Sequence, residues 1–183
     1  DDHFAGGGSS SDGSQLQVFN DYTISESTIA TSYWNDFYQG IFRANTLLLK
    51  LPDVDMDEAT RRRFAAETKT LRAIYYFELV RLFRNIPLIT NTLGTDEFFD
   101  VVQADPNDVY AQIETDLLEA IPDLPMTLDL ANEAGMLTKG AAKAILGKVY
   151  LYQNKNAEAT AQFAEINGVP GTTSSFGYKL LNN

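Results

Sequence analysis

Side chains that could carry out catalysis are scarce in this sequence of 183 residues. The single histidine, His3, lies in a glycine- and serine-rich run, without the converging partners that a general base or metal ligand needs. Cysteine is absent, which excludes thiolate catalysis, disulfides and thiolate-bound metal in this chain. A glycosidase needs two carboxylates at a set separation in space, and no pair of acidic residues stands out for that role. We therefore expect no catalytic residue, no cofactor and no metal site.

The balance of charged residues restricts the classes of partner that the protein can bind. Acidic residues outnumber basic ones by 25 to 14, for a net charge of −11. Phosphate backbones would be repelled by such a field, so we expect no nucleic-acid binding. The basic cluster Arg61 to Arg63 is interpreted as a solvated helix face, since a membrane-binding patch needs more charges than three.

Helices and irregular segments alternate along the chain. Residues 1–32 are rich in Gly, Ser, Asp and Thr, which predicts a loop region. Apolar steps of three and four residues predict a first helix over 34–52, closed by Pro52. Asp105 as N-cap and Pro106 at the first helical position start another helix, and two more are predicted over 139–154 and 157–166. No run shows the two-residue alternation of a half-buried strand, so the predicted fold class is all-α.

The longest predicted helix spans 57–84. Its apolar residues recur at helical spacing and predict one buried stripe formed by Phe64, Leu71, Ile74, Tyr75, Leu79, Leu82 and Phe83. Asn85 is expected to take the left-handed cap conformation, and Pro87 to force an extended exit over 86–89. The Phe98–Phe99 pair follows among acidic residues, and it is equally consistent with packing on this helix and with contact to a partner.

A repeat pattern joins the last two predicted helices. Five residues fall at the spacings of the tetratricopeptide repeat, namely Leu146, Gly147, Tyr150, Ala159 and Phe163. Small residues at Gly147 and Ala159 would let the helices of a hairpin close, while the larger side chains fill the space between them. Such hairpins cannot bury both faces alone, which predicts that residues 33–166 stack as a tetratricopeptide-like α-α superhelix.

Three stretches together resemble one family. They are WNDFYQGIFRANTLLLKLP over 34–52, AAETKTLRAIYYFELVRLFRNIPLIT over 65–90 and GMLTKGAAKAILGKVYLYQNKNAEA over 135–159. They resemble the N-terminal part of SusD-like (RagB/SusD) proteins, the surface glycan-binding lipoproteins of Bacteroidetes. Those proteins are longer, so the resemblance implies that a lipidated cysteine precedes this chain and that residues 167–183 begin a C-terminal half.

The resemblance also implies a function. The expected activity is non-catalytic binding of an oligosaccharide or polysaccharide at the outer face of the outer membrane, where an N-terminal lipid anchors the protein. Delivery of the glycan to a SusC-type TonB-dependent transporter would follow. An alternative left open is a helical-repeat adaptor that binds protein and no glycan. A polysaccharide-active enzyme has only the acidic composition in its favour.

Within that expectation, the better glycan-binding candidates are aromatic and amide residues in irregular sequence, because loops present side chains that the core does not use. They are Phe19, Asn20, Tyr22, His3 and Phe4. Trp34 has a face suited to a sugar ring, yet its place in the helical period favours the core. Glu67, Arg72 and Asn45 are interpreted as structural polar residues, each bonded to a neighbouring helix or to backbone.

Overall fold

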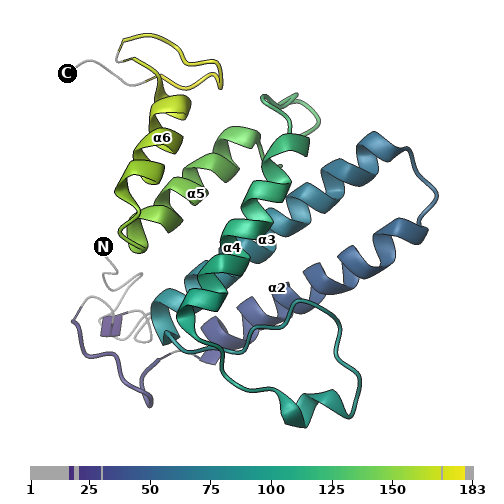
Figure 1. The fold of residues 1–183 in the computed structure, drawn as a ribbon, viewed down its shortest axis with the longest axis vertical. Coiled ribbons are helices and arrows are strands. Elements are labelled where there is room, and N and C mark those ends of the chain that lie inside the picture. Colours follow the sequence, from purple (N-terminus) through teal and green to yellow (C-terminus); the bar gives the residue numbers. More distant parts are fainter. Residues whose placement is uncertain (1–16, 19–20, 30, 170, 180–183) are drawn as a thin grey trace, which may run out of the picture. The chain divides into compact units, whose positions relative to one another are not determined.

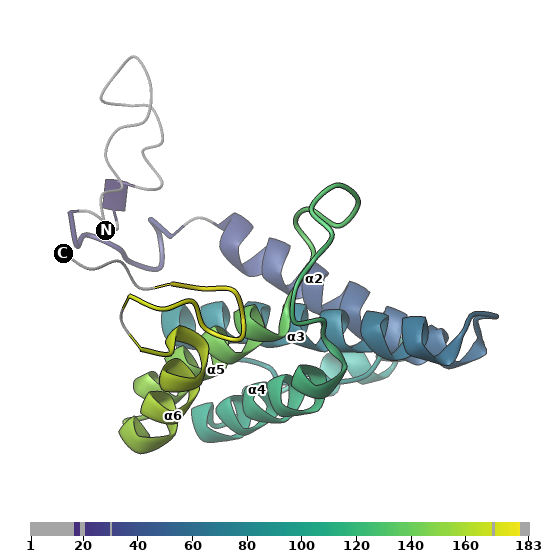
Figure 2. The ribbon, with the colours of Figure 1, turned by 90° about the horizontal axis from the view of Figure 1, so that it is seen from above.

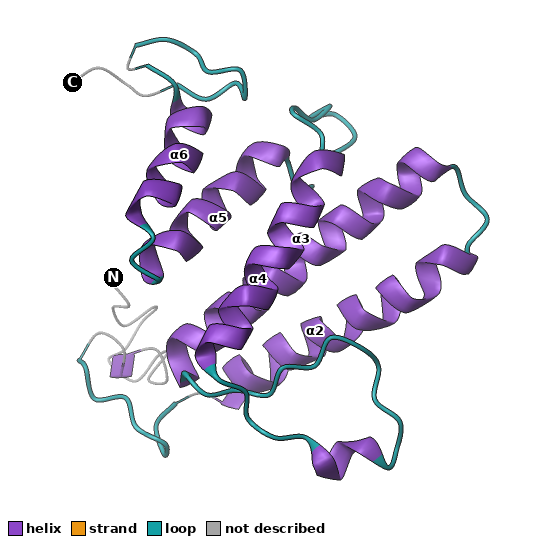
Figure 3. Cartoon of the chain, viewed as in Figure 1, coloured by secondary structure: helices purple, strands orange, loops and turns teal. Residues whose placement is uncertain are grey.

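The computed structural model describes residues 17–18, 21–29, 31–169 and 171–179, which are mostly helical (Figures 1 and 3). The chain divides into two units, residues 1–39 and 40–183, and each is described by itself. The α-helices labelled in Figure 1 are α2 (Thr31–Lys50), α3 (Glu58–Phe83), α4 (Pro106–Ala120), α5 (Lys139–Tyr152) and α6 (Asn156–Asn167). Across the described residues, extended pairing is limited to two isolated bridges, Pro87 with Gln103 and Thr173 with Lys179. The predicted all-α class is confirmed.

Three helices begin at side chains that cap them. The Asp57 carboxylate accepts from the Thr60 N–H at 2.9 Å at the start of α3. Asp105 accepts from the Asn107 N–H at 2.8 Å, with Pro106 as the first residue of α4. Thr138 accepts from the Ala141 N–H at 3.1 Å before α5. Each bond satisfies an amide that has no partner within its helix, which is why these starts follow from sequence.

The end of α3 differs from expectation by one residue. Arg84, rather than Asn85, takes the positive φ of +60°, and its N–H donates to the Val80 carbonyl at 3.0 Å. Because α3 ends at Phe83, the turn out of the helix falls on the residue that comes next. The extended exit then buries Ile86 completely and pairs Pro87 with Gln103.

The predicted stripe on α3 is largely wrong. Of its seven residues only Leu79 is buried, whereas Phe64 and Leu71 are exposed. The buried line runs instead through Ala66, Thr70, Ala73, Phe77 and Val80. Ala66, Thr70 and Ala73 on this face have small side chains, and α4 lies close along α3 (Figures 1 and 2). A helix with neighbours on several sides does not reveal from its own apolar period which side is packed most tightly.

The predicted hairpin of α5 and α6 is confirmed. The two helices pack on each other, and a Cβ added at Gly147 would lie 2.7 Å from the Phe163 ring. Leu146 and Ala159 are completely buried. Residues 171–179 then return to the start of α5, where the Tyr178 ring occupies the space that a side chain at Gly140 would need.

Candidate functional site

A buried polar network joins α2, α3 and α4. Arg72 donates from Nε and Nη2 to both carboxylate oxygens of Asp116, at 2.8 and 2.7 Å. Its Nη1 donates to the Asn45 side-chain oxygen at 2.8 Å and to the Thr90 carbonyl at 3.1 Å. Gln112 adds a further hydrogen bond to Asp116. The predicted structural role of Arg72 and Asn45 is thereby confirmed.

The same network fastens the chain that follows α3. The Asn45 amide nitrogen donates to the carbonyls of Ile89 and Asn91, at 2.8 and 3.0 Å. The Tyr76 hydroxyl donates to the Ile89 carbonyl at 2.6 Å and accepts from the Ile89 N–H at 2.8 Å. Burial raises the pKa of the Tyr76 hydroxyl to about 12. These polar groups are used to hold the fold together and leave no ligand site at this point.

The other polar expectations on α3 need correction. Glu67 accepts from Arg63 on its own helix at 3.1 Å, and Arg63 also pairs with Glu133. Arg61 donates to four carbonyls of the turn between α2 and α3, namely those of Leu51, Pro52, Val54 and Met56. These carbonyls lie at and after the end of a helix and need donors from elsewhere. The interpretation of Arg61 to Arg63 as a solvated face is therefore wrong for Arg61 and Arg63.

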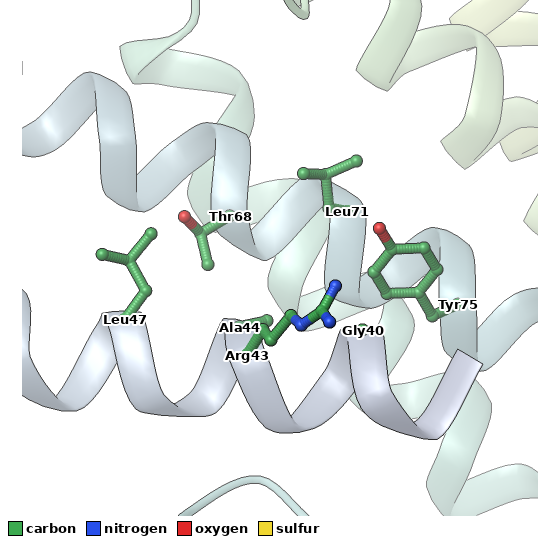
Figure 4. A pocket seen from close by; sticks show the side chains of 7 residues that line it. All are labelled: Gly40, Arg43, Ala44, Leu47, Thr68, Leu71 and Tyr75. Atoms are coloured by element: carbon green, nitrogen blue, oxygen red, sulfur yellow. The ribbon is translucent and has the colours of Figure 1, made fainter. Parts of the chain in front are cut away.

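A shallow groove lies between α2 and α3 (Figure 4). Its volume is about 240 Å³, below the roughly 300 Å³ at which small-molecule sites usually begin. It is lined by Gly40, Arg43, Ala44, Leu47, Thr68, Leu71 and Tyr75. The Tyr75 ring lies so close to α2 that a Cβ at Gly40 would come within 2.5 Å of it. Arg43 is the one charged residue of this lining, which offers no acid–base pair.

The predicted glycan-binding residues are only partly covered by the structure. Tyr22 is 92% exposed and has a φ of +54°. His3, Phe4, Phe19 and Asn20 lie outside the described residues. The role of the five residues therefore stays a prediction.

Aromatic pairs at the start of α2 escaped the sequence analysis. The rings of Trp34 and Tyr38 lie with centroids 4.8 Å apart, and those of Tyr33 and Phe37 lie 6.1 Å apart. Trp34 is half-buried, so the predicted place in the core is only partly met. The spacing of four residues between aromatic side chains could have indicated both pairs.

Two further properties bear on function. In the part of the chain that the structure describes, no group of three or more His, Cys, Asp or Glu residues is placed to hold a metal ion. The helices described there are also too short or too polar to cross a bilayer.

Comparison with known proteins gives a consistent result. A SusD-like family model, described as starch-binding and associating with the outer membrane, matches residues 3–151. A SusD-like protein of Formosa agariphila is 30% identical over 148 residues, which are 79% of this chain and 29% of that protein. The chain thus spans less than a third of the length of this curated relative.

Solved structures agree with the sequence match. A laminarin-binding SusD-like protein is 59% identical, with a TM-score of 0.87 over 97% of this chain and 38% of the other. A SusD superfamily protein from Parabacteroides distasonis is 31% identical, with a TM-score of 0.73 over 89% of this chain and 36% of the other. With the family model matching most of its length, the chain belongs to the SusD-like family.

Proposed function

We propose that the protein binds an oligosaccharide or polysaccharide at the cell surface without modifying it and delivers it to a SusC-type TonB-dependent transporter. An N-terminal lipid would hold it at the outer face of the outer membrane. The observation that carries the proposal is the 59% identity, over 97% of this chain, to a laminarin-binding protein of the same family. Laminarin is accordingly the first ligand to test.

Aromatic residues of the first unit are the proposed contacts for the sugar. A pyranose ring has an apolar C–H face that stacks on aromatic rings, and its hydroxyl groups bond to amides and carboxylates. Tyr22 is almost fully exposed, and Trp34 is half-buried. Phe19, Asn20, His3 and Phe4 remain in the proposed set on the sequence argument alone.

Three of the described carboxyl groups are poorly suited to act as a catalytic acid. The general acid of a glycosidase needs a raised pKa. A hydrogen bond from Thr60 instead holds the pKa of Asp57 below its usual value. Asn132 lowers the pKa of Asp129 in the same way, and Arg63 lowers that of Glu133. The fully buried carboxylate, Asp116, is paired with Arg72.

Calorimetric titration of the complete protein with laminarin tests the binding step. Heat of binding is expected with laminarin and not with dextran, a glucose polymer of different linkage. Trp34→Ala and Tyr22→Ala should each weaken binding about tenfold, the equivalent of 1.4 kcal/mol. Phe42→Ala alters a different aromatic residue of α2, which is 59% exposed. It serves as the matched control and should bind as the original protein does.

Two results would refute the proposal. Release of shorter glycans from laminarin by the purified protein would contradict the non-catalytic role. If the tagged protein does not co-purify with a SusC-type transporter from outer membranes, delivery to such a transporter is contradicted. Stable binding of a peptide, without binding of any glycan, would favour the adaptor alternative.

A further inference from the structure

The loop of residues 92–102, called here the Phe98–Phe99 loop, is fastened at both ends. Next to it, the Ala104 N–H donates to the Ile86 carbonyl at 2.9 Å, and Pro87 pairs with Gln103. On the other side, the carbonyl of Asn91 accepts from Asn45 in the buried network. The ends of the loop are therefore fixed to the helices.

The loop also has a defined shape of its own. The Glu97 carboxylate accepts from the Gly94 N–H at 2.6 Å, and the Glu97 N–H donates to the Gly94 carbonyl at 3.1 Å. These bonds lead into a short 3-10 helix, η2 (Glu97–Asp100), which Figure 1 shows at the far end of the loop. Anchored ends and internal bonds are typical of compact functional loops.

Apolar side chains of the loop face solvent. Phe99 is 93% exposed, Val102 is 78% exposed and Phe98 is 57% exposed. The sequence left packing on α3 and contact with a partner equally open, and these exposures exclude the packing. Burial of such side chains against a partner would stabilise a complex, and the loop presents three of them within five consecutive residues.

Acidic residues flank these apolar residues in the sequence. Asp96, Glu97 and Asp100 lie beside the two phenylalanines, and no lysine, arginine or histidine occurs between Arg84 and Lys139. An anionic membrane surface and a second copy of this chain, with its net charge of −11, would both be repelled. A sugar is matched less well than a protein, because the Glu97 carboxylate already accepts from the Gly94 N–H and the Val102 side chain cannot form hydrogen bonds. Asp96 and Asp100 beside Phe99 are the groups that a sugar could use, and the crosslinking below separates that case.

We propose that the Phe98–Phe99 loop is a docking element for another protein. The partner would offer an apolar pocket for Phe99 and lysine or arginine side chains facing Asp96 and Asp100. A buried aromatic anchor supplies affinity in such contacts, and the charges at the rim supply specificity and a fast association rate. The inference goes beyond the proposed function, since it does not depend on the partner being the transporter.

Photo-crosslinking of the complete protein on the cell surface tests the inference. A photoreactive benzoylphenylalanine replaces Phe99, and in a control it replaces Leu130, which is 76% exposed on a different loop. An adduct with one other protein is expected from position 99 and not from position 130. The inference is overturned by no adduct, by an adduct within the same chain, by one with glycan or lipid only, or by equal adducts from both positions.

The crosslinked protein is then purified and its affinity measured. Phe98→Ser with Phe99→Ser should weaken binding at least tenfold, and Asp96→Asn with Asp100→Asn should weaken it and reduce its salt dependence. Leu130→Ser should have no effect. Equal affinity of the phenylalanine double variant and the original protein would refute docking through this loop.

The two proposals fail separately. All variants should keep the laminarin affinity and melting temperature of the original protein, because the altered side chains face solvent. If the crosslinked protein is not the transporter, the docking proposal still holds, and the transporter does not bind at this loop. Loss of laminarin binding in the original protein would refute the proposed function alone.

Discussion

Arg72 of α3 and Asp116 of α4 face each other through two parallel hydrogen bonds, at a point where their side chains are 7% and 1% exposed. Burial by itself lowers the pKa of Arg72, but the hydrogen bonds and charge of Asp116 outweigh it and hold that pKa above its usual value. Removal of either partner would leave an uncompensated charge or unpaired polar atoms inside the protein.

Arg72→Met should therefore reduce the free energy of unfolding by about 3–5 kcal/mol, as expected when one partner of a buried ion pair is removed. Urea unfolding followed by circular dichroism measures it. Arg62→Met, which breaks an exposed pair with Asp123, is the control and should cost about 1 kcal/mol or less. Adding Asp116→Leu to Arg72→Met should recover part of the loss, and a cost below 1 kcal/mol for Arg72→Met would contradict the role of the pair.

Because of Tyr76, the free energy of unfolding should fall as the pH becomes alkaline. Its pKa in the folded protein, about 12, lies above the ordinary tyrosine value of 10.0. The stabilising contribution of the neutral hydroxyl is therefore complete below pH 10 and is lost as the pH rises to 12, for a total of about 3 kcal/mol.

Tyr76→Phe tests this dependence. At pH 8 the variant should be less stable by about 1–3 kcal/mol, because the N–H and carbonyl of Ile89 lose their hydroxyl partner. The difference from the original protein should shrink between pH 10 and 12, measured by urea unfolding at each pH. Tyr22→Phe alters an exposed side chain and serves as control, and a difference that stays constant across this range would count against Tyr76.

Gly147→Ala should destabilise the hairpin of α5 and α6. At an exposed position inside a helix, replacing glycine with alanine usually stabilises the helix by about 1 kcal/mol. Here its methyl group would meet the Phe163 ring at 2.7 Å, and overpacking of this kind costs about 1–3 kcal/mol. Thermal unfolding should show a lower Tm, and adding Phe163→Leu should restore part of it. A Tm above that of the original protein would show that the helices adjust freely.

Asn45→Asp should loosen the segment after α3 while keeping an acceptor for Arg72. The new carboxylate cannot donate to the carbonyls of Ile89 and Asn91, and it would repel them. Hydrogen exchange should become faster over residues 86–104, with little change in α6. Asn35→Asp, on the same helix and exposed, is the matched control. Unchanged exchange over 86–104 would mean that the Asn45 amide does not hold this segment.

Local rules predicted where helices begin and how one hairpin closes. Asp57, Asp105 and Thr138 cap helices through bonds to residues two or three positions later, so the necessary information lies within one turn. Gly147 and Phe163 were found because repeat spacing carries the geometry of two helices. The packed face of α3 was missed, since it depends on α4, which follows more than twenty residues after α3 ends.

For polar residues that bond distant segments, the sequence predicted a structural role but not the residue to which each is bonded. The Arg72 guanidinium meets residues 27 positions earlier and 44 positions later, and no pattern along the chain indicates either. For the candidate site, exposure was the missing quantity. Trp34 and Phe99 are both aromatic residues in the sequence, and only the fold shows that one is half-buried and the other is 93% exposed.

The way the Phe98–Phe99 loop is attached has an evolutionary consequence. The bonds at its base involve Ile86, Pro87, Asn91, Gln103 and Ala104, through backbone groups outside residues 92–102. Mutations and insertions within the loop leave these bonds in place, and doubling its length would cost only about 0.6 kcal/mol in closure entropy. Selection can thus rewrite this segment in related proteins and change what they recognise, while the helices beneath it stay the same.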